Sequence, residues 1–291
     1  MTAERFQEIE RQGGWVNLSG RAKWQLKGGD RIRYLNGQVT QDVRKASQEA
    51  AVYACVTDVK GRICGDVFVR VSDDGEALWV DAEAHLAEEL GIRLERYIIA
   101  DDVELAEITD DWGLWHAFGR ASEGISGCRA ERYGVPGVDV WLPSGETPSF
   151  SGVELTADEI ETIRIVRGVP RHPNELNLRT FPPEAGLEAR AMDFSKGCYI
   201  GQEVLSRIRT TGKMPRCLVR WALSEAAVAV SVGAEMATVE KATVGEVTSV
   251  TRDPVSGLQV GLGYVKQGAR LDSELLVGGG MASIRAASQF S

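Results

Sequence analysis

Hydrophobic residues follow two different spacings in the first third of the chain. β-rich runs over residues 50–59 and 62–71 flank Lys60-Gly61, an arrangement typical of a β-hairpin. From residue 81 large aliphatic residues recur at every fourth position, with Glu and Arg between them, which predicts an amphipathic helix over residues 81–99. The N-terminal region is therefore expected to mix strands and helices.

Shorter elements are expected before, between and after the predicted hairpin and helix. The pattern predicts a strand over residues 15–27 and, behind Gly28-Gly29, a short helix over residues 31–36 that Asp30 caps. Further strands are predicted at residues 77–80, 103–108, 114–118 and 138–142.

Residues 156–195 carry a helix signal followed by a proline-rich stretch. Thr156 and Glu159 have the spacing of a capping box, which predicts a helix that runs to about Arg167. Residues 168–195 are rich in proline and in turn residues, so we expect an ordered connector or a ligand-facing loop there.

Short strands dominate after Gly212, at residues 217–223, 243–251 and 258–265. They predict a small antiparallel barrel or sandwich over residues 234–269. The expected fold class is therefore α+β, with a mixed N-terminal portion and an all-β C-terminal domain.

Composition narrows the class of protein. The chain has 291 residues, of which 43% are hydrophobic and 26% charged, so two or three compact units are expected and global disorder is excluded. No apolar run approaches about 18 residues, so we expect no membrane span. The first residues are polar and unlike a signal peptide, from which we expect a cytoplasmic protein. The five cysteines are scattered without a C-x-x-C pair, which argues against a disulfide framework, a zinc ribbon or another metal site.

Charge is distributed unevenly along the chain. The net charge is −9, which argues against general nucleic-acid binding. Residues 164–220 nevertheless carry eleven basic and five acidic side chains, a local charge of +6. Such a tract either forms a solvated face or focuses a field on an anionic ligand.

Residues 196–203, Lys-Gly-Cys-Tyr-Ile-Gly-Gln-Glu, are the densest candidate site. Gly201 precedes a good helix start, so Cys198 is expected just before a helix N-terminus, where the partial positive charge and free N–H groups favour a thiolate. Lys196 lies two residues away and adds a positive charge. A buried and inert cysteine is the alternative.

This motif resembles the signature of the YgfZ family of folate-binding proteins, which are relatives of the glycine-cleavage aminomethyltransferase, or T-protein. Mitochondrial members of that family are iron–sulfur cluster assembly factors. The resemblance extends over about residues 15–265, and the further stretches that carry it are residues 29–43, 58–63, 168–170, 181–187 and 245–249.

The resemblance implies a T-protein fold with a central channel for tetrahydrofolate or a one-carbon derivative. Residues 1–212 would form the folate-binding region, as two intertwined α+β subdomains, and residues 213–291 a β-barrel domain. The implied role is support of iron–sulfur cluster assembly or repair, including that of radical enzymes that modify tRNA. Folate and iron–sulfur client or assembly proteins would be the partners, and Cys198 the residue most needed.

Two positions depart from the T-protein pattern. Gly65 stands where the first of two adjacent acidic residues is expected, directly before Asp66, and Val166 stands where a folate-contacting glutamate is expected. A valine cannot accept hydrogen bonds from a pterin edge, and a lost acid removes an electrostatic aid to transfer. A folate-dependent aminomethyltransferase of the glycine-cleavage type is therefore the alternative function, and catalysis stays an open question.

Candidate residues follow from the signature and the basic tract. Cys198 and Lys196 are the candidates for chemistry. Arg164, Arg207 and again Lys196 are candidates for the glutamate tail of folate, because their side chains pair with carboxylates. Asp66 and Glu203 are candidates for the pterin donors, and Tyr199 and Gln202 complete the expected folate site. A tRNA-binding surface that uses Arg207 and Arg209 is the third hypothesis.

Overall fold

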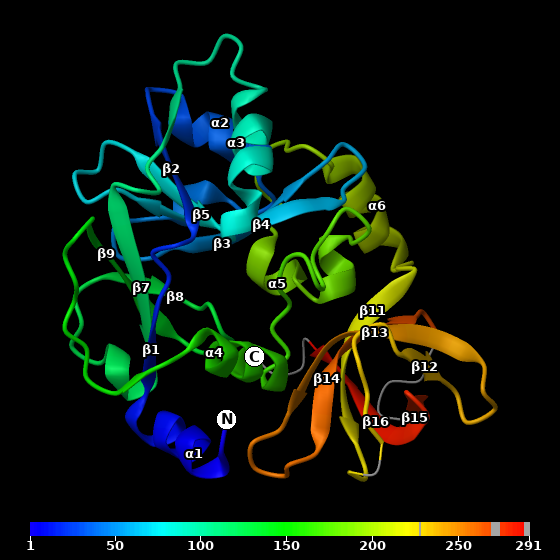
Figure 1. The fold of residues 1–291 in the computed structure, drawn as a ribbon. Helices are drawn as coiled ribbons and strands as arrows, with labels where there is room; N and C mark the ends of the chain where they lie inside the picture. Colours follow the sequence, from blue (N-terminus) through cyan, green and yellow to red (C-terminus); the bar gives the residue numbers. More distant parts are fainter. Residues whose placement is uncertain (227, 269–273, 288–291) are drawn as a thin grey trace.

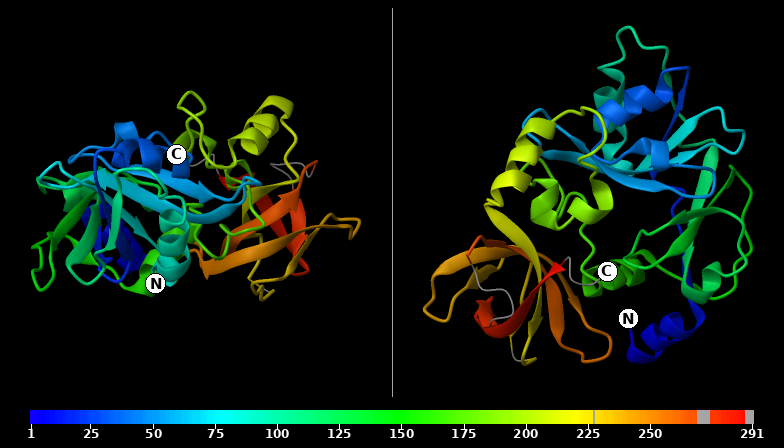
Figure 2. Two further views of the ribbon diagram at one scale, coloured as in Figure 1. Left: turned by 90° about the horizontal axis from the view of Figure 1, so that it is seen from above. Right: turned by 180° about the vertical axis from the view of Figure 1, so that it is seen from behind.

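The computed structural model describes residues 1–226, 228–268 and 274–287. It contains two five-stranded sheets and a closed six-stranded barrel. In Figure 1 the barrel forms its own lobe at the lower right, beside the two sheets, and Figure 2 shows the same separation from above and from behind.

The first sheet has the strand order β10-β1-β7-β9-β8 and is antiparallel except for the β1–β10 pair. Its strands are β1 (Gly14–Asn17), β7 (Trp112–Phe118), β8 (Cys128–Ala130), β9 (Gly137–Pro143) and β10 (Val153–Glu154). Helices α1 (Ala3–Gln12) and α4 (Ala157–Val166) bury Ile9, Ile160 and Ile163 in one apolar cluster with its strands. The capping box of Thr156 and Glu159 begins α4 as predicted.

The second sheet has the order β3-β4-β5-β2-β6 and is antiparallel throughout. Its strands are β2 (Ala22–Lys27), β3 (Val52–Thr57), β4 (Ile63–Val71), β5 (Leu78–Ala82) and β6 (Glu104–Glu107). Helices α2 (Arg31–Gln38) and α3 (Ala87–Glu95) pack on it with the largest apolar cluster of the molecule. The predicted hairpin is the β3–β4 pair.

Short helical turns connect these elements. They are η1 (Val43–Lys45), η2 (Ala84–Leu86), η3 (Gly119–Ser122), η4 (Pro182–Ala185) and α5 (Glu188–Ala191). The last two lie in the proline-rich connector, which holds no longer element. Helix α6 (Gln202–Thr211) then leads into the barrel.

The barrel closes in the order β11-β14-β13-β12-β15-β16. Its strands are β11 (Arg216–Leu223), β12 (Glu235–Ala237), β13 (Thr243–Arg252), β14 (Gln259–Lys266), β15 (Glu274–Val277) and β16 (Gly280–Ala286). Ile165 of α4 packs against Leu218, Leu262 and Tyr264 of the barrel, which joins the two parts.

The α+β class and the C-terminal antiparallel barrel are confirmed, and several boundaries differ. Residues 15–27 were expected to form one strand, but a turn at 18–21 splits them into β1 and β2, which belong to different sheets. The helix predicted over 81–99 begins only at Ala87, because residues 78–82 pair with β2 and β4. The barrel was predicted over residues 234–269, but β11 before this range and β15 and β16 after it also belong to the barrel. Ala269 itself lies outside the described residues. Of the helices in the described ranges, none is long and apolar enough to cross a bilayer.

Candidate functional site

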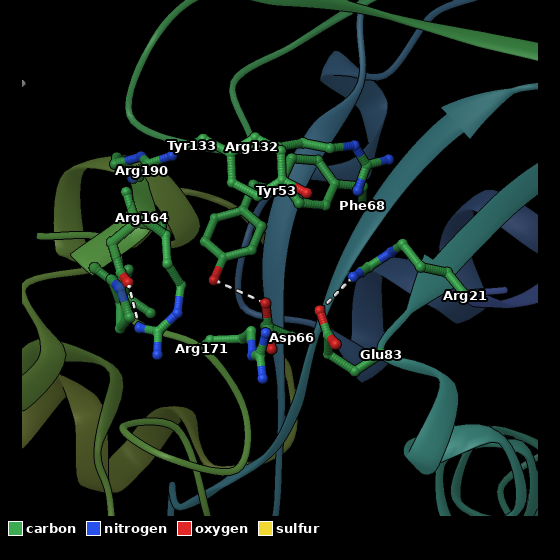
Figure 3. Close-up of a pocket in the computed structure, with 13 residues that line it drawn as sticks. Arg21, Tyr53, Asp66, Phe68, Glu83, Arg132, Tyr133, Arg164, Arg171 and Arg190 are labelled. Carbon is green, nitrogen blue, oxygen red and sulfur yellow. Dashed lines mark hydrogen bonds and ion pairs between the residues drawn. The ribbon is translucent and has the colours of Figure 1, made fainter. Parts of the chain in front are cut away.

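Both sheets and the connector enclose a small cavity in the N-terminal part (Figure 3). Its volume is about 50 Å³. Its polar lining consists of Arg21, Tyr53, Asp66, Glu83, Arg132, Tyr133, Arg164, Arg171 and Arg190. Five arginines and two carboxylates thus face the cavity, and each arginine already pairs with a carboxylate of the chain. The cavity therefore favours a hydrogen-bonding ligand over one recognised by charge alone.

Asp66 lies on β4 at the wall of this cavity and is buried. The Tyr53 hydroxyl donates to its Oδ2 over 3.0 Å, whereas the buried Oδ1 has no hydrogen-bond partner among the described residues. Burial raises the pKa of Asp66 to about 6, against the opposing charge of Arg21. A buried unsatisfied oxygen is costly, so Oδ1 is an acceptor available to an N–H donor of a ligand.

A buried network of charges fixes the cavity wall where the two sheets meet. Arg132 donates to the carboxylates of Asp81 and Asp139, at 2.8 Å and 2.6 Å for its closest contacts. Its guanidinium lies 4.1 Å from the ring centroid of Phe68. Asp139 also accepts from His116, over 2.7 Å, which gives that buried histidine a structural role. Asp81 belongs to β5 and Asp139 to β9, so the network ties one sheet to the other.

Arg164 also lines the cavity, but its guanidinium is occupied. The side chain is 1% exposed and pairs with Glu161 and Glu175. Its Nη2 also donates to Ser249 of the barrel over 2.8 Å. The structure thus places Arg164 in an internal ion-pair network, which leaves it no free donor fork for the glutamate tail expected from the sequence.

Lys196 is buried as well, and its ammonium holds the backbone of a distant segment. Nζ donates to the carbonyl oxygens of Asn36, Val39 and Gln41 over 2.6 to 2.7 Å. Burial lowers the pKa of Lys196 to about 7. In the described part of the chain, no hydrogen bond or ion pair joins it to Cys198. Its observed contacts are those of an anchor for the signature loop, rather than of an activating cation or a tail-binding residue.

Cys198 itself is exposed, so the alternative of a buried thiol is excluded. It lies three residues before Gly201, which is the N-cap of α6 and has a φ of 87°. The Gly201 backbone packs tightly on the β3–β4 turn, where a Cβ would come 2.7 Å from the Asp58 oxygen. Glycine at this position therefore fixes the path of the chain between the thiol and the helix.

The remaining signature residues divide between the core and the surface. The Tyr199 side chain is buried, its hydroxyl has no partner, and burial raises its pKa to about 12. Gln202 is half-buried in the first turn of α6, and Glu203 and Arg207 are exposed on that helix. None of these four lines the cavity of Asp66. The structure thus brings only Asp66 and Arg164 of the expected folate residues together.

Gly65 and Val166, the two departures from the T-protein pattern, lie in different surroundings. At Gly65 a Cβ would lie 2.9 Å from side-chain atoms of Leu86 and Leu90, so an aspartate has no room under these residues. Val166 is the last residue of α4 and is half-buried.

The cavity offers a pterin a hydrogen-bond acceptor, but it is too small to hold the ring system. Asp66 Oδ1 can accept a hydrogen bond from an N–H group of a pterin, whereas the five arginines already pair with carboxylates of the chain. A volume of about 50 Å³ holds a few water molecules, whereas small-molecule sites are typically about 300–1,000 Å³. A ring system therefore enters only after side chains at the rim, such as Arg171 and Arg190, move.

A second hollow lies on the other side of the connector and is larger, about 520 Å³. Cys64, Leu90, Arg93, His172 and Leu178 contribute to its lining. His172 stacks on His85, with 2.7 Å between His85 Nε2 and His172 Nδ1. Across the described ranges, no group of three or more His, Cys, Asp or Glu side chains is placed to hold a metal ion.

Sequence reasoning did not identify Tyr53, Arg132 or Arg21 as cavity residues. Each lies outside the basic tract and far from the signature in sequence. A weak signal was available in β3, where Tyr53 is opposite Phe68 across the predicted hairpin, two residues from Asp66.

No protein-family model matches the chain. A mitochondrial iron–sulfur cluster assembly factor IBA57 homolog of Pyricularia oryzae is 28% identical over 213 residues, covering 68% of this chain and 54% of that protein. The homolog of Phaeosphaeria nodorum is 28% identical over 207 residues, covering 64% of this chain and 50% of that protein. This chain thus spans about half the length of these curated relatives.

Aminomethyltransferases are similar over a greater share of the chain. The Rubrobacter xylanophilus enzyme is 26% identical over 308 residues, covering 92% of this chain and 80% of that protein. The crystal structure of the glycine cleavage system aminomethyltransferase T from Bartonella henselae superposes with a TM-score of 0.83 at 17% identity, covering 99% of this chain and 89% of that one. The chain therefore has the aminomethyltransferase T-protein fold, with a closed antiparallel C-terminal barrel.

Proposed function

We propose that this chain is a YgfZ-type accessory protein that binds a reduced folate and supports the assembly or repair of iron–sulfur clusters through Cys198. The observation that carries the proposal is the exposure of this thiol on a loop that Lys196 anchors from below. Relatives described as iron–sulfur cluster assembly factors support it. The proposed clients include radical enzymes that modify tRNA, and the proposed location is the cytoplasm.

A rigid loop suits a thiol that must meet a partner. The Lys196 ammonium ties the loop to the last turn of α2 and to the residues after it. The Tyr199 ring packs into an apolar cluster with Met192, Leu205 and Ile208. Cys198 stands between these two buried side chains and is itself exposed. Because its neighbours are fixed, the sulfur can react or bind with little loss of conformational freedom.

Complementation tests the role of the thiol. Cells that lack the chain receive the wild type, Cys198→Ser or Cys217→Ser, and the activity of an iron–sulfur enzyme is measured in extracts. Cys217 is the matched control, since it is a half-buried thiol of the barrel. We expect the control to restore activity and Cys198→Ser to fail at equal protein level. Full rescue by Cys198→Ser would contradict the proposal.

The proposed folate site is the cavity of Asp66, and it is tested by binding. Tryptophan fluorescence of the purified protein is titrated with tetrahydrofolate and with 5-formyltetrahydrofolate. Asp66→Asn is expected to weaken saturable binding, because the neutral amide exchanges one acceptor oxygen for a donor. Arg207→Ala is the control, since Arg207 lies on the exposed side of α6 and outside the cavity lining. No saturable binding by the wild type would remove folate from the proposal.

A second candidate is a folate-dependent aminomethyltransferase. The 26% identity to an aminomethyltransferase over 92% of this chain favours it. Gly65 and Val166 disfavour it, because acidic residues of the T-protein pattern are missing there. The test is tetrahydrofolate-dependent release of ammonia from an aminomethylated dihydrolipoyl substrate, and turnover no higher than in a blank without protein would end it.

A further inference from the structure

Exposed cations surround the loop that carries Cys198, which we define as residues 193–201. Lys45 of η1 pairs with Asp193 at one end of this loop, with 2.7 Å between Nζ and Oδ2. Arg209 of α6 covers the ring of Phe194, with its guanidinium 4.2 Å from the centroid. The elements η1, far away in sequence, and α6, directly after the loop, thus each bring a cationic side chain to the N-terminal half of the loop.

A third cation lies at the other end of the loop. Gly201 packs against the β3–β4 turn, where a Cβ on Gly201 would come 2.9 Å from the Gly61 Cα. Lys60 immediately precedes Gly61 and is exposed. Along the loop, Cys198 thus lies between residues 193–194, which contact Lys45 and Arg209, and Gly201, which packs on the turn that carries Lys60.

These charges are only partly neutralised. Among the described residues, no ion pair joins Lys60, Arg207 or Arg209 to a carboxylate, although nineteen such pairs are found elsewhere in that set. The chain as a whole carries a net charge of −9. An unpaired cationic surface attracts anionic partners.

We propose that the loop of Cys198 and the cations around it form the docking surface for an acidic segment of a partner protein, which brings the partner's reacting group to the thiol. This rests on the proposed function, because it names the kind of protein that would meet Cys198. The surface also offers an apolar contact, since Val59, next to Lys60, is 70% exposed. An exposed aliphatic side chain beside the cations favours a protein partner over RNA.

The rate of thiol–disulfide exchange at Cys198 measures whether the surface prefers an acidic peptide to a basic peptide or to RNA. Three probes of equal length carry a terminal cysteine or thiol activated as a mixed disulfide with 5-thio-2-nitrobenzoate: a glutamate-rich peptide, a lysine-rich peptide and an oligoribonucleotide. The Cys198 thiolate attacks the probe sulfur, a protein–probe disulfide forms, and coloured thionitrobenzoate leaves with the electron pair of the broken S–S bond. A background of Cys64→Ser and Cys217→Ser removes the two half-buried thiols.

We expect the glutamate-rich peptide to react about tenfold or more faster than the lysine-rich peptide at low salt, and the ratio to fall steeply as salt is added. The double variant Lys60→Glu/Arg209→Glu should abolish the preference. Arg120→Glu/Arg252→Glu makes the same change of charge elsewhere and should retain it, because both residues are exposed, Arg120 on η3 beside α1 and Arg252 at the end of β13.

Two results would overturn the inference. Equal rates for the two peptides, or a faster lysine-rich peptide, would mean that the cations do not steer a partner. A faster oligoribonucleotide would assign the surface to nucleic acid instead. The outcome is separate from that of the proposed function: the peptide preference can persist while Cys198→Ser restores iron–sulfur enzyme activity, in which case the docking surface stands and the role of the thiol falls.

Discussion

Arg164 of α4 and Glu175 of the connector form an ion pair of 3.0 Å between side chains that are 1% and 0% exposed. The second oxygen of the Glu175 carboxylate accepts from the hydroxyls of Thr248 and Ser249 over 2.7 Å and 2.6 Å. One carboxylate thus joins α4, the connector and the barrel. Because the group is fully buried, its charge is tolerable only while these partners are in place.

Removal of this charge should destabilise the whole chain. Glu175→Gln keeps the volume but leaves Arg164 with Glu161 as its remaining carboxylate partner. We expect the free energy of unfolding to fall by about 3 kcal/mol, the lower end for a broken buried pair. Urea denaturation measures it, with Glu225→Gln at an exposed position as the control. An unchanged midpoint would mean that the pair contributes nothing to the junction.

Lys196 is expected to stabilise the signature loop rather than to activate the thiol. Lys196→Met removes the donor for the buried carbonyls of Val39 and Gln41. We expect a loss of about 1–3 kcal/mol in the free energy of unfolding and faster hydrogen exchange at residues 197–200. Lys213→Met, at an exposed position, should change neither. Wild-type exchange in the Lys196 variant would contradict an anchoring role.

A substitution at Gly201 tests how closely the signature loop packs on the β3–β4 turn. In Gly201→Ala the new methyl group would meet backbone atoms of Asp58 and Gly61 at 2.7 and 2.9 Å, at a φ of 87°. We expect a loss of about 1–3 kcal/mol in the free energy of unfolding. Gly197→Ala is the matched control four residues earlier, since a Cβ there meets nothing within 4 Å and should stay within about 0.5 kcal/mol.

Asp66 gives the folded state a specific pH dependence. Burial raises its pKa from 3.8 to about 6, so between these values the folded state binds more protons than the unfolded state. The stabilisation is present below about pH 4 and is lost as the pH rises through 6.

Asp66→Asn removes this titration. Relative to the variant, the wild type should lose up to about 3 kcal/mol between pH 4 and 7, at about 1.4 kcal/mol for each pKa unit. Urea midpoints across this range measure the difference, and Asp110→Asn, at an exposed position, serves as the control. A constant difference between wild type and variant would mean that Asp66 is ionised throughout.

Local sequence signals predicted much of the secondary structure. The turn at Lys60-Gly61 predicted the hairpin, and the capping box at Thr156 predicted α4, because each signal acts within a few residues. The spacing that predicted α6 and the strands of the barrel is equally local. Residues 81–82 were predicted to begin a helix, but they extend the strand predicted from residue 77, because they pair with β2 and β4.

The sequence by itself determined the fold class, the barrel and the position of Cys198 before a helix. Only the tertiary structure decided which side chains face one another. Lys196 meets Asn36 across 160 residues of chain, and Arg164 meets Ser249 across 85, so neither contact leaves a trace in local spacing. Both residues were candidates for binding a ligand because they are cations. Burial gave them internal partners instead, because a charge removed from water is stable only where nearby acceptors or opposite charges replace its solvation.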